Sequence, residues 1–474
     1  MTHPTQPLRR YDTWQPHLLI VALFLLAAAP TLWGDGMFLD GLWYATLARN
    51  LAVGTGSFWA PHLTATVEPV FTAHPPLAFG LQSLLFRLLG DHYYVERLYS
   101  LLCYLLATLL LRAAWRHVRP GPLAWWPVLL WSASPLLVWS VSNNMLENTL
   151  QLWLLGAVWA LLRRYRPGGR GWLVLAGGLL SAALLTKGPV GLFVWAMPGC
   201  WWLAHRSQMS WRQALADTAL LVLCTLALPL VLYLAMPPVR AFAQAYLDLQ
   251  LTGSLPVQSV PHRLALLLHL LTELLPALGL CALMLLAGRR IPPLPTAAPA
   301  LAATGLLAVL PYLFFLKQRQ FYLLPAMPLL ALALAAWTAP LVETRLLPHL
   351  FRLRRLYAGI ALILAAATCG LSLHVAGQPE RDAPKLELAH ALVRQLAPGT
   401  LLQSCSSLRA DMQLHGYLAR YARVDLAYQS RKPAAGYLTG PGCAETDTLC
   451  GDLLWTGTAY RLYRCPPGYA CAWR

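Results

Sequence analysis

A few ionisable residues lie just outside the apolar stretches of this sequence, and their side chains could act as acids, bases or anion ligands. Asp40 follows a long apolar stretch, and His74 precedes the pair Pro75-Pro76. A carboxylate can take a proton from a hydroxyl group, and cationic side chains can bind an anion. Each residue also has a structural interpretation, with Asp40 as a helix N-cap and His74 as the end of an extended segment. The elements that position these residues are therefore needed to choose between the two interpretations.

The composition predicts an integral membrane protein. Of the 474 residues, 58% are hydrophobic and 12% are charged, whereas a soluble domain carries about 25% charged residues. About eleven apolar stretches have the length that a helix needs to cross a hydrocarbon core. We therefore expect an all-α polytopic membrane bundle. The expected spans are His17–Gly34, Val95–Trp115, Pro122–Ser140, Leu146–Leu162, Trp172–Thr186, Val190–Ala204, Ala214–Met236, Leu264–Ala287, Ala298–Leu316, Phe321–Leu341 and Leu356–His374.

The distribution of Lys and Arg predicts the orientation of these spans. The loops on one side are short and basic, as cytoplasmic loops are, so residues 1–16 are expected to be a cytoplasmic tail and residues 17–374 the membrane domain. The first outward loop, residues 35–94, and the tail, residues 375–474, then face the periplasm of a cell with the chain in its inner membrane. The same loops hold about half of the cations behind the net charge of +17. No basic face with interleaved aromatic residues indicates nucleic-acid binding.

The first outward loop is predicted to hold two amphipathic helices. Apolar residues recur with helical spacing from Asp40 to Leu51, with Arg49 on the polar side. A second helix is expected over Leu77–Leu89, directly after the Pro pair. We expect both helices to lie along the membrane surface.

The tail changes to an ordinary density of charges and is expected to form a small α+β domain outside the cytoplasm. A helix is predicted over Pro384–Leu396 and a strand over Leu453–Thr456. Five cysteines fall in this part, where disulfides are allowed. The short spacings favour Cys443–Cys450 and Cys465–Cys471 and would leave Cys405 unpaired, although sequence does not fix the connectivity.

Six pieces of the sequence carry a family resemblance in their order along the chain. They are Asp40-Gly-Leu-Trp-Tyr44-Ala-Thr-Leu-Ala-Arg49-Asn50, His74-Pro75-Pro76-Leu77, Glu96-Arg97-Leu98, Glu147-Asn148-Thr149-Leu150, Leu185-Thr186-Lys187-Gly188-Pro189, and Lys317-Gln-Arg319-Gln-Phe-Tyr322-Leu-Leu-Pro325-Ala-Met-Pro328. With these pieces, the membrane part from about Trp33 to Trp337 resembles the GT-C glycosyltransferases of the protein O-mannosyltransferase and lipid A aminoarabinose transferase type.

The resemblance implies a site that transfers a sugar from a polyprenyl (undecaprenyl) phosphate to an extracytoplasmic lipid, glycan or protein. In that family the acid of the first loop is the general base, a role that falls on Asp40. The leaving lipid phosphate needs fixed cations. The residues weighed for binding the phosphate or substrate are His74, Arg97, Lys187, Lys317, Arg319 and Tyr322, with His74 and Lys317 ranked first. Glu68 and Glu147 are weighed as acceptor-binding or structural residues.

Two departures from the family pattern limit what is carried over. Gly41 stands where many relatives have a second acid, and His74 stands where the aminoarabinose transferases have Lys. The lipid A substrate is therefore not carried over. No further carboxylate is placed to form a covalent sugar intermediate, which favours an inverting single displacement. No cofactor is required by this chemistry, although a divalent metal at Asp40 is left open.

Two other classes of function compete with the transferase. A transporter or flippase would also have many spans, and His269 and Glu273 are ionisable groups within the expected eighth span. Transporters of this size often show internal repeats, and none is visible here. A noncatalytic assembly protein would not need the Asp40 and His74 segments. We therefore favour the transferase.

Overall fold

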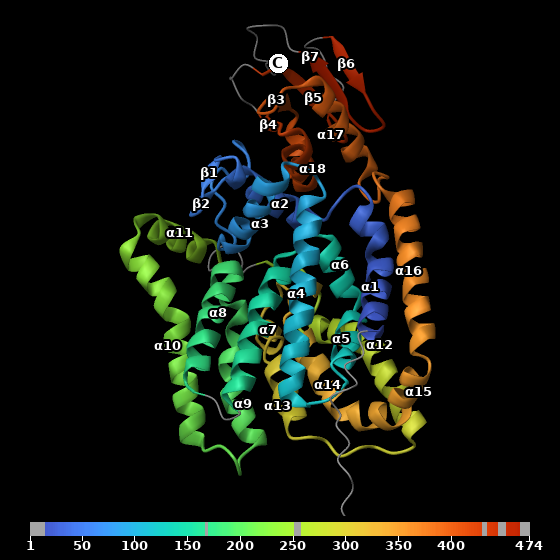
Figure 1. Ribbon diagram of the computed structural model, residues 1–474. Coiled ribbons are helices and arrows are strands. Elements are labelled where there is room, and N and C mark those ends of the chain that lie inside the picture. The colour runs from blue at the N-terminus through green and yellow to red at the C-terminus, as the bar shows by residue number, and fades with distance from the viewer. Residues whose placement is uncertain (1–14, 166–168, 251–256, 429–433, 444–451, 465–474) are drawn as a thin grey trace, which may run out of the picture.

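The computed structural model describes residues 15–165, 169–250, 257–428, 434–443 and 452–464, and places a helical bundle beneath a small domain of helices and strands (Figure 1). The helices outside the first loop, up to residue 375, are α1 (Gln15–Trp33), α4 (Val95–Val118), α5 (Trp125–Ser132), α6 (Pro135–Ser142), α7 (Leu146–Arg164), α8 (Gly171–Lys187), η2 (Gly188–Ala196), α9 (Met197–Ala204), α10 (Trp211–Ala235), α11 (Pro237–Asp248), α12 (Ala265–Gly288), α13 (Ala297–Leu306), η4 (Leu310–Phe314), η5 (Gln320–Leu323), α14 (Met327–Leu341), η6 (Val342–Leu346), α15 (Leu347–Arg352) and α16 (Arg354–Val375).

Within the described ranges, eight helices are long and apolar enough to cross a membrane, or nine if the bent pair α6 and α7 is counted as one span. The sequence predicted about eleven. The difference arises at breaks inside the apolar stretches. The expected third span is divided into α5 and α6, and α6 meets α7 at an angle of 116°. Pro135 begins α6 and cannot continue a helix from α5, and Asn144 takes a left-handed φ of 51° between α6 and α7.

The expected fifth and sixth spans form one apolar stretch, Gly171–Ala204, that is broken where the sequence predicted a break. α8 ends at Lys187, and Gly188 follows with a φ of 68°, which glycine adopts readily. Trp201, near the end of α9, lines a cavity of about 270 Å³ together with Tyr165, which directly follows α7. The chain therefore returns to the side of the bundle where α7 ends.

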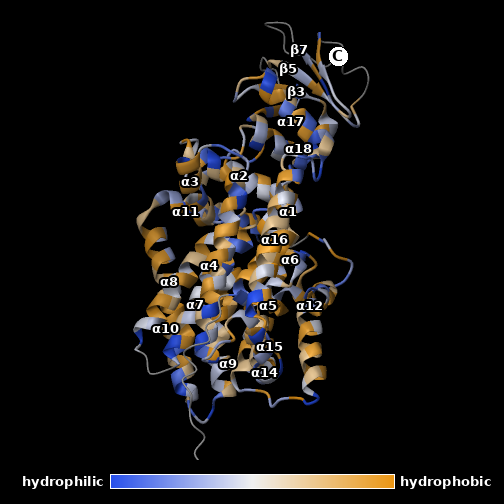
Figure 2. Cartoon of the chain, turned by 45° about the vertical axis from the view of Figure 1, so that its right-hand side comes forward, coloured by the Kyte–Doolittle hydropathy of each residue, from blue (hydrophilic) through white to orange (hydrophobic). Residues whose placement is uncertain are grey.

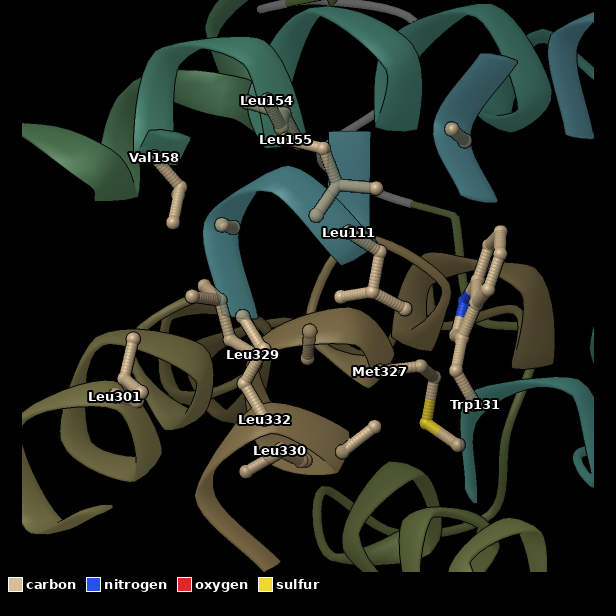
Figure 3. Close-up of a cluster of buried hydrophobic side chains, with 14 of the residues drawn as sticks. Leu111, Trp131, Leu154, Leu155, Val158, Leu301, Met327, Leu329, Leu330 and Leu332 are labelled. Atoms are coloured by element: carbon tan, nitrogen blue, oxygen red, sulfur yellow. The ribbon is translucent and has the colours of Figure 1, made fainter. Parts of the chain in front are cut away.

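Leucine, alanine and tryptophan side chains fill the interior of the bundle. Trp131 of α5 and Met327 of α14 are buried among leucines of α4, α7 and α13 (Figure 3). By contrast, α10, α12 and α16 expose apolar side chains, including Leu223, Leu283 and Leu362. Figure 2 colours much of these helices as hydrophobic. Such faces are stable against lipid and would be costly in water. The expected multi-pass membrane bundle is confirmed.

The first loop contains α2 (Leu39–Ala52), the short strands β1 (Gly56–Ser57) and β2 (Ala60–Pro61), and α3 (Leu77–Leu89). The predicted bounds of the second helix are confirmed. Two predictions about α2 are wrong. Phe38 occupies the N-cap and Asp40 lies in the first turn, so Asp40 is not a capping residue. The helix is also covered on several sides, and Arg49 is 4% exposed where a polar surface position was expected, because α3 and the C-terminal domain pack against it.

After α16 the described residues form a mixed sheet with helices, which we call the C-terminal domain, so the predicted α+β fold of this part is confirmed. Its elements are α17 (Ala383–Gln395), β3 (Leu401–Ser404), η7 (Ser406–Ala410), α18 (Met412–Tyr417), η8 (Leu418–Ala422), β4 (Asp425–Tyr428), β5 (Gly436–Thr439), β6 (Leu453–Thr456) and β7 (Arg461–Arg464). The strand order is β4-β3-β5-β7-β6. Strands β4 and β5 run parallel to β3, and β7 runs antiparallel to β5 and β6.

The disulfide pattern differs from the prediction. Cys405 pairs with Cys443, with 5.7 Å between their Cα atoms. Cys405 directly follows β3 and Cys443 comes soon after β5, and because these neighbouring strands are parallel their carboxyl ends meet at one edge of the sheet. The predicted Cys443–Cys450 bridge is therefore wrong, and Cys405 is not left over. Cys450, Cys465 and Cys471 lie outside the described residues.

Candidate active site

The first turn of α2, which carries Asp40, is held against the bundle by two asparagines. The backbone N–H of Phe38 donates to Oδ1 of Asn143 at 2.8 Å, and Nδ2 of Asn144 donates to the carbonyl oxygen of Gly41 at 3.2 Å. Both asparagines come from the break between α6 and α7. The break between the apolar helices α6 and α7 thus supplies the polar side chains that fix the position of Asp40.

Gly41 is required by this close packing. A Cβ atom at this position would lie 2.1 Å from the carbonyl oxygen of Asn143 and 2.6 Å from the sulfur of Met37. Both distances are shorter than atoms of folded proteins allow, so even an alanine would push α2 away from the bundle. A second acid directly after Asp40 does not fit in this chain.

Asp40 lies among charged and hydroxyl groups from four separate segments. The charges that act on its carboxylate belong to Lys187, Glu147 and Arg319, and the hydroxyl of Tyr44 donates a hydrogen bond to it. Burial raises the pKa of Asp40 to about 6, while Lys187 and Arg319 oppose this rise and Glu147 adds to it. A carboxylate with a pKa in this range is mostly ionised at neutral pH and is a stronger base than an ordinary aspartate.

Lys187 and Glu147 form a buried ion pair beside Asp40. Lys187 ends α8 and Glu147 lies in the first turn of α7, and their side chains are 4% and 1% exposed. The Lys187 ammonium also lies 5.1 Å from the ring centre of Phe321 and 5.7 Å from that of Tyr322. Oε2 of Glu147 has no hydrogen-bond partner among the described residues. Oε2 of Glu147 is therefore a buried acceptor that is available to a bound substrate.

His74 lies beside Tyr44, with 6.0 Å between the two ring centres. Burial, together with the charges of Lys187 and Lys317, lowers the pKa of His74 to about 3. The imidazole is thus neutral near pH 7 in the unliganded protein. The prediction ranked His74 and Lys317 first among the cationic phosphate ligands, but its surroundings make His74 a neutral hydrogen-bonding group.

Lys317 and Arg319 reach the same cluster from the segment between η4 and η5. Arg319 is exposed and acts electrostatically on both Asp40 and Lys317. Burial and the nearby Arg319 lower the pKa of Lys317. Gln318 between them is 2% exposed; its amide donates to three backbone carbonyls and its Oε1 accepts from the N–H of Leu266. This buried glutamine fixes the segment and places one cation on either side of it.

Two predicted site residues do not join the cluster. Arg97 is 3% exposed and its Nη2 donates to the carbonyl oxygen of Gly36 at 2.5 Å, so it holds the segment before α2. Glu68 is exposed with a φ of 49°, and its carbonyl oxygen accepts from the N–H of Leu63. Eight residues are brought together: Asp40, Tyr44, His74, Glu147, Lys187, Lys317, Arg319 and Tyr322.

Glu273, which the transporter alternative relied on, has a structural role. Its Oε2 accepts hydrogen bonds from Oγ of Ser134 at 2.9 Å and from the N–H of Leu136 at 3.0 Å. It thus binds the amino end of α6, where a negative charge stabilises a helix. For the metal that was left open at Asp40, no group of three His, Cys, Asp or Glu side chains that could hold an ion is found in the described ranges.

Three of the residues that build the site were not singled out from the sequence. Asn143, Asn144 and Gln318 act by forming hydrogen bonds to backbone groups. A signal was present, since Asn143-Asn144 interrupts an apolar stretch and Gln318 stands between two cations. A polar residue at such a position must find a partner when it is buried.

Comparisons with known proteins bear on the fold of the chain. Residues 73–233 match the family model of dolichyl-phosphate-mannose-protein mannosyltransferase. No curated protein sequence matches the chain. The crystal structure of ArnT from Cupriavidus metallidurans bound to undecaprenyl phosphate is similar over 97% of this chain and 99% of that chain, with a TM-score of 0.68 and 17% identity. The crystal structure of the same protein in the apo state is similar over 94% of this chain and 97% of that chain, with a TM-score of 0.65 and 17% identity.

A more distant similarity extends to an archaeal enzyme. The Archaeoglobus fulgidus oligosaccharyltransferase in its apo form is 13% identical, with a TM-score of 0.53 over 88% of this chain and 64% of that chain. The chain thus has the fold of the GT-C glycosyltransferases, and the predicted resemblance and fold class are confirmed.

Proposed function

We propose that this chain, with its GT-C fold, is a membrane glycosyltransferase that takes a sugar from a polyprenyl phosphate and uses Asp40 as its general base. The observation that carries the proposal is the place of Asp40, a half-buried carboxylate with a pKa of about 6 that lies near Lys187 and Arg319. The undecaprenyl phosphate in the similar ArnT structure supports a lipid phosphate as the donor's leaving group. The family model matched by residues 73–233 supports the same class of donor.

The geometry suggests how one displacement would proceed. Asp40 takes the proton of the acceptor hydroxyl as its oxygen bonds to the anomeric carbon of the sugar. The bond from that carbon to the phosphate oxygen breaks at the same time, and its electron pair leaves with the lipid phosphate. Lys317 and Arg319 neutralise the charge of the phosphate, and His74 offers it a neutral hydrogen bond. The configuration at the anomeric carbon is inverted.

Glu147 and Lys187 act beside the reacting groups. The unused Oε2 of Glu147 can accept a hydrogen bond from a hydroxyl of the acceptor or of the sugar. Lys187 forms an ion pair with Glu147 and opposes the rise in the pKa of Asp40. We assign Arg97 to holding the segment before α2, and we assign Glu68 no part in the reaction.

We further propose that the site faces away from the cytoplasm. Asp40 lies in the loop beneath the C-terminal domain, whereas α7 ends at the opposite end of the bundle with Arg163 and Arg164 in its last turn (Figure 1). Short basic loops are typical of the cytoplasmic side. The N-terminus then lies in the cytoplasm and the C-terminal domain in the periplasm of a cell with this chain in its inner membrane.

The proposal is tested with purified protein in liposomes that contain polyprenyl phosphates carrying different radiolabelled sugars. A transferase removes the label from one lipid and passes it to an acceptor fraction from the cell envelope. A flippase instead moves the labelled lipid across the bilayer without consuming it. His269→Ala is the matched variant for the transporter alternative, because this residue lies in a span and outside the cluster. Transferase activity should survive His269→Ala, and movement of intact lipid that His269→Ala abolishes would refute the proposal.

The pH dependence of the reaction follows from the raised pKa of Asp40. The base is active only when ionised, so kcat/KM, which reports the free enzyme, should fall about tenfold for each pH unit below about 6 and level off above it. His74, with a pKa of about 3, changes charge well below this range and adds no second step. The measurement is kcat/KM from pH 3.5 to 8.5. A midpoint near 4 would mean that Asp40 is not the base described here.

A further inference from the structure

We propose that the C-terminal domain is part of the catalytic unit, because its Tyr417 and Arg420 are positioning residues that fix the helix carrying Asp40. This inference rests on the proposed function and gives the domain a role in it. The domain contacts α2 at both ends, and Asp40 lies between the two contacts.

The first contact holds the segment directly before α2. The N–H of Met37 donates to the hydroxyl of Tyr417 at 3.1 Å, and Nε2 of Gln413 donates to the carbonyl oxygen of Met37 at 2.8 Å. The backbone of Asp35 exchanges hydrogen bonds with Gln378 and Glu380 at 2.7 and 2.9 Å. Met37 is three residues before Asp40, so any shift of this segment is passed directly to the carboxylate.

The second contact holds the last turns of α2 through buried charges. Nη2 of Arg49 donates to the carbonyl oxygen of Ala419 at 3.0 Å, and its Nη1 lies 3.4 Å from the carboxylate of Asp91. Arg420, which is 3% exposed, makes a two-point ion pair with Glu96 at 2.9 and 3.0 Å and a further one with Asp91 at 2.7 Å. Planar two-point pairs of this kind fix orientation as well as distance.

Apolar packing joins the two contacts. Met37 and Leu42 of the first loop share a buried cluster with Leu386 and Tyr417 of the domain. Gly416 allows this approach, since a Cβ atom there would lie 3.3 Å from side-chain atoms of Leu42 and Trp43. The helix with Asp40 is therefore enclosed between the bundle and the domain.

A domain that only capped the bundle would not need these directional contacts around the base. Proton transfer requires the carboxylate within hydrogen-bond reach of the acceptor hydroxyl. A displacement of about 1 Å can cost about 100-fold in rate. We therefore expect the contacts of Tyr417 and Arg420 to affect the rate of the chemical step more than the binding of donor.

The test uses Tyr417→Phe, which removes only the hydroxyl that accepts from Met37. Tyr428→Phe is the matched control, because it removes a hydroxyl of the same domain whose hydrogen bond goes to His415 of that domain rather than to the first loop. With full-length protein in liposomes, Tyr417→Phe should lower kcat about 10- to 100-fold with the donor KM unchanged. Tyr428→Phe should leave kcat within twofold. Arg420→Lys, which cannot keep the two-point pair, should also lower kcat.

A double-mutant cycle that combines Tyr417→Phe with Asp40→Asn shows whether Tyr417 acts through Asp40. In the Asp40→Asn background, Tyr417→Phe should cause no further loss, and a full additional loss would overturn the proposal. A second measurement, hydrogen exchange, does not depend on transferase activity. Hydrogen exchange of the peptide covering residues 37–52 should become faster in Tyr417→Phe and stay as in wild type in Tyr428→Phe. Unchanged exchange together with unchanged kcat would also overturn the proposal. If wild type consumes no donor, the proposed function fails, and the exchange rates alone decide whether the domain holds α2.

Discussion

Replacing Asp40 by Asn is expected to lower kcat by about 100- to 10,000-fold, the range for loss of a general base. Asparagine keeps the shape of the side chain but cannot take the acceptor proton. The donor KM should change little, since the phosphate is assigned to Lys317 and Arg319. The measurement is transfer of label from the polyprenyl phosphate sugar in liposomes at pH 7.5. Wild-type activity in Asp40→Asn would remove Asp40 from the mechanism and leave the fold assignment intact.

The same variant should remain folded, which separates loss of chemistry from loss of structure. A carboxylate whose pKa is raised from 3.8 to about 6 binds its proton more tightly in the folded state than in the unfolded state. Its ionisation therefore reduces stability as the pH rises from about 4 to 6, and the neutral Asn avoids this reduction at pH 7.5. The thermal midpoint in detergent should be unchanged or higher. Asp452→Asn, the same change at an exposed carboxylate of the C-terminal domain, serves as the control for both measurements.

Replacing Lys187 by Met is expected to destabilise the folded protein by about 3–5 kcal/mol, because it leaves the Glu147 carboxylate buried without a partner. The variant should show a strongly lowered thermal midpoint and no transfer. Replacing Glu147 by Gln as well removes the unpaired charge. The double variant should regain most of the stability but not the activity, since Lys187 and Glu147 also act on Asp40.

The partly exposed ion pair between Arg119 and Glu343 is the control for the Lys187→Met experiment. Arg119 and Glu343 are 34% and 31% exposed, and pairs of this kind contribute about 0–1 kcal/mol. Glu343→Gln should therefore change the thermal midpoint far less than Lys187→Met does. Equal effects of the two substitutions would mean that the Lys187–Glu147 pair is not buried as described.

Several elements could be predicted because they depend on local sequence. The bounds of α3 and β6 and the helix α17 follow from apolar periodicity and from Pro and Gly positions. The membrane class follows from composition, and the break after Lys187 follows from Gly188-Pro189. The resemblance carried by six ordered pieces pointed to Asp40, His74, Lys187, Lys317 and Arg319, which the structure places in one cluster.

Other features depended on which segments meet, and the sequence alone did not reveal them. The partner of Cys405 depended on two neighbouring parallel strands. The neutral state of His74 depended on burial and on cations more than 100 residues away in sequence.

The sequence by itself determined the membrane class, the short local helices and the residue types of the site, because hydrophobic length, periodicity and charge are read along the chain. The tertiary structure decided what those residues do. Arg49 was expected at a polar surface and is instead buried against the C-terminal domain, and Arg97 was expected at the substrate and instead binds the backbone of Gly36. The physical reason is that burial and charge pairing are set by the neighbours that the fold brings together, and these neighbours come from distant parts of the sequence.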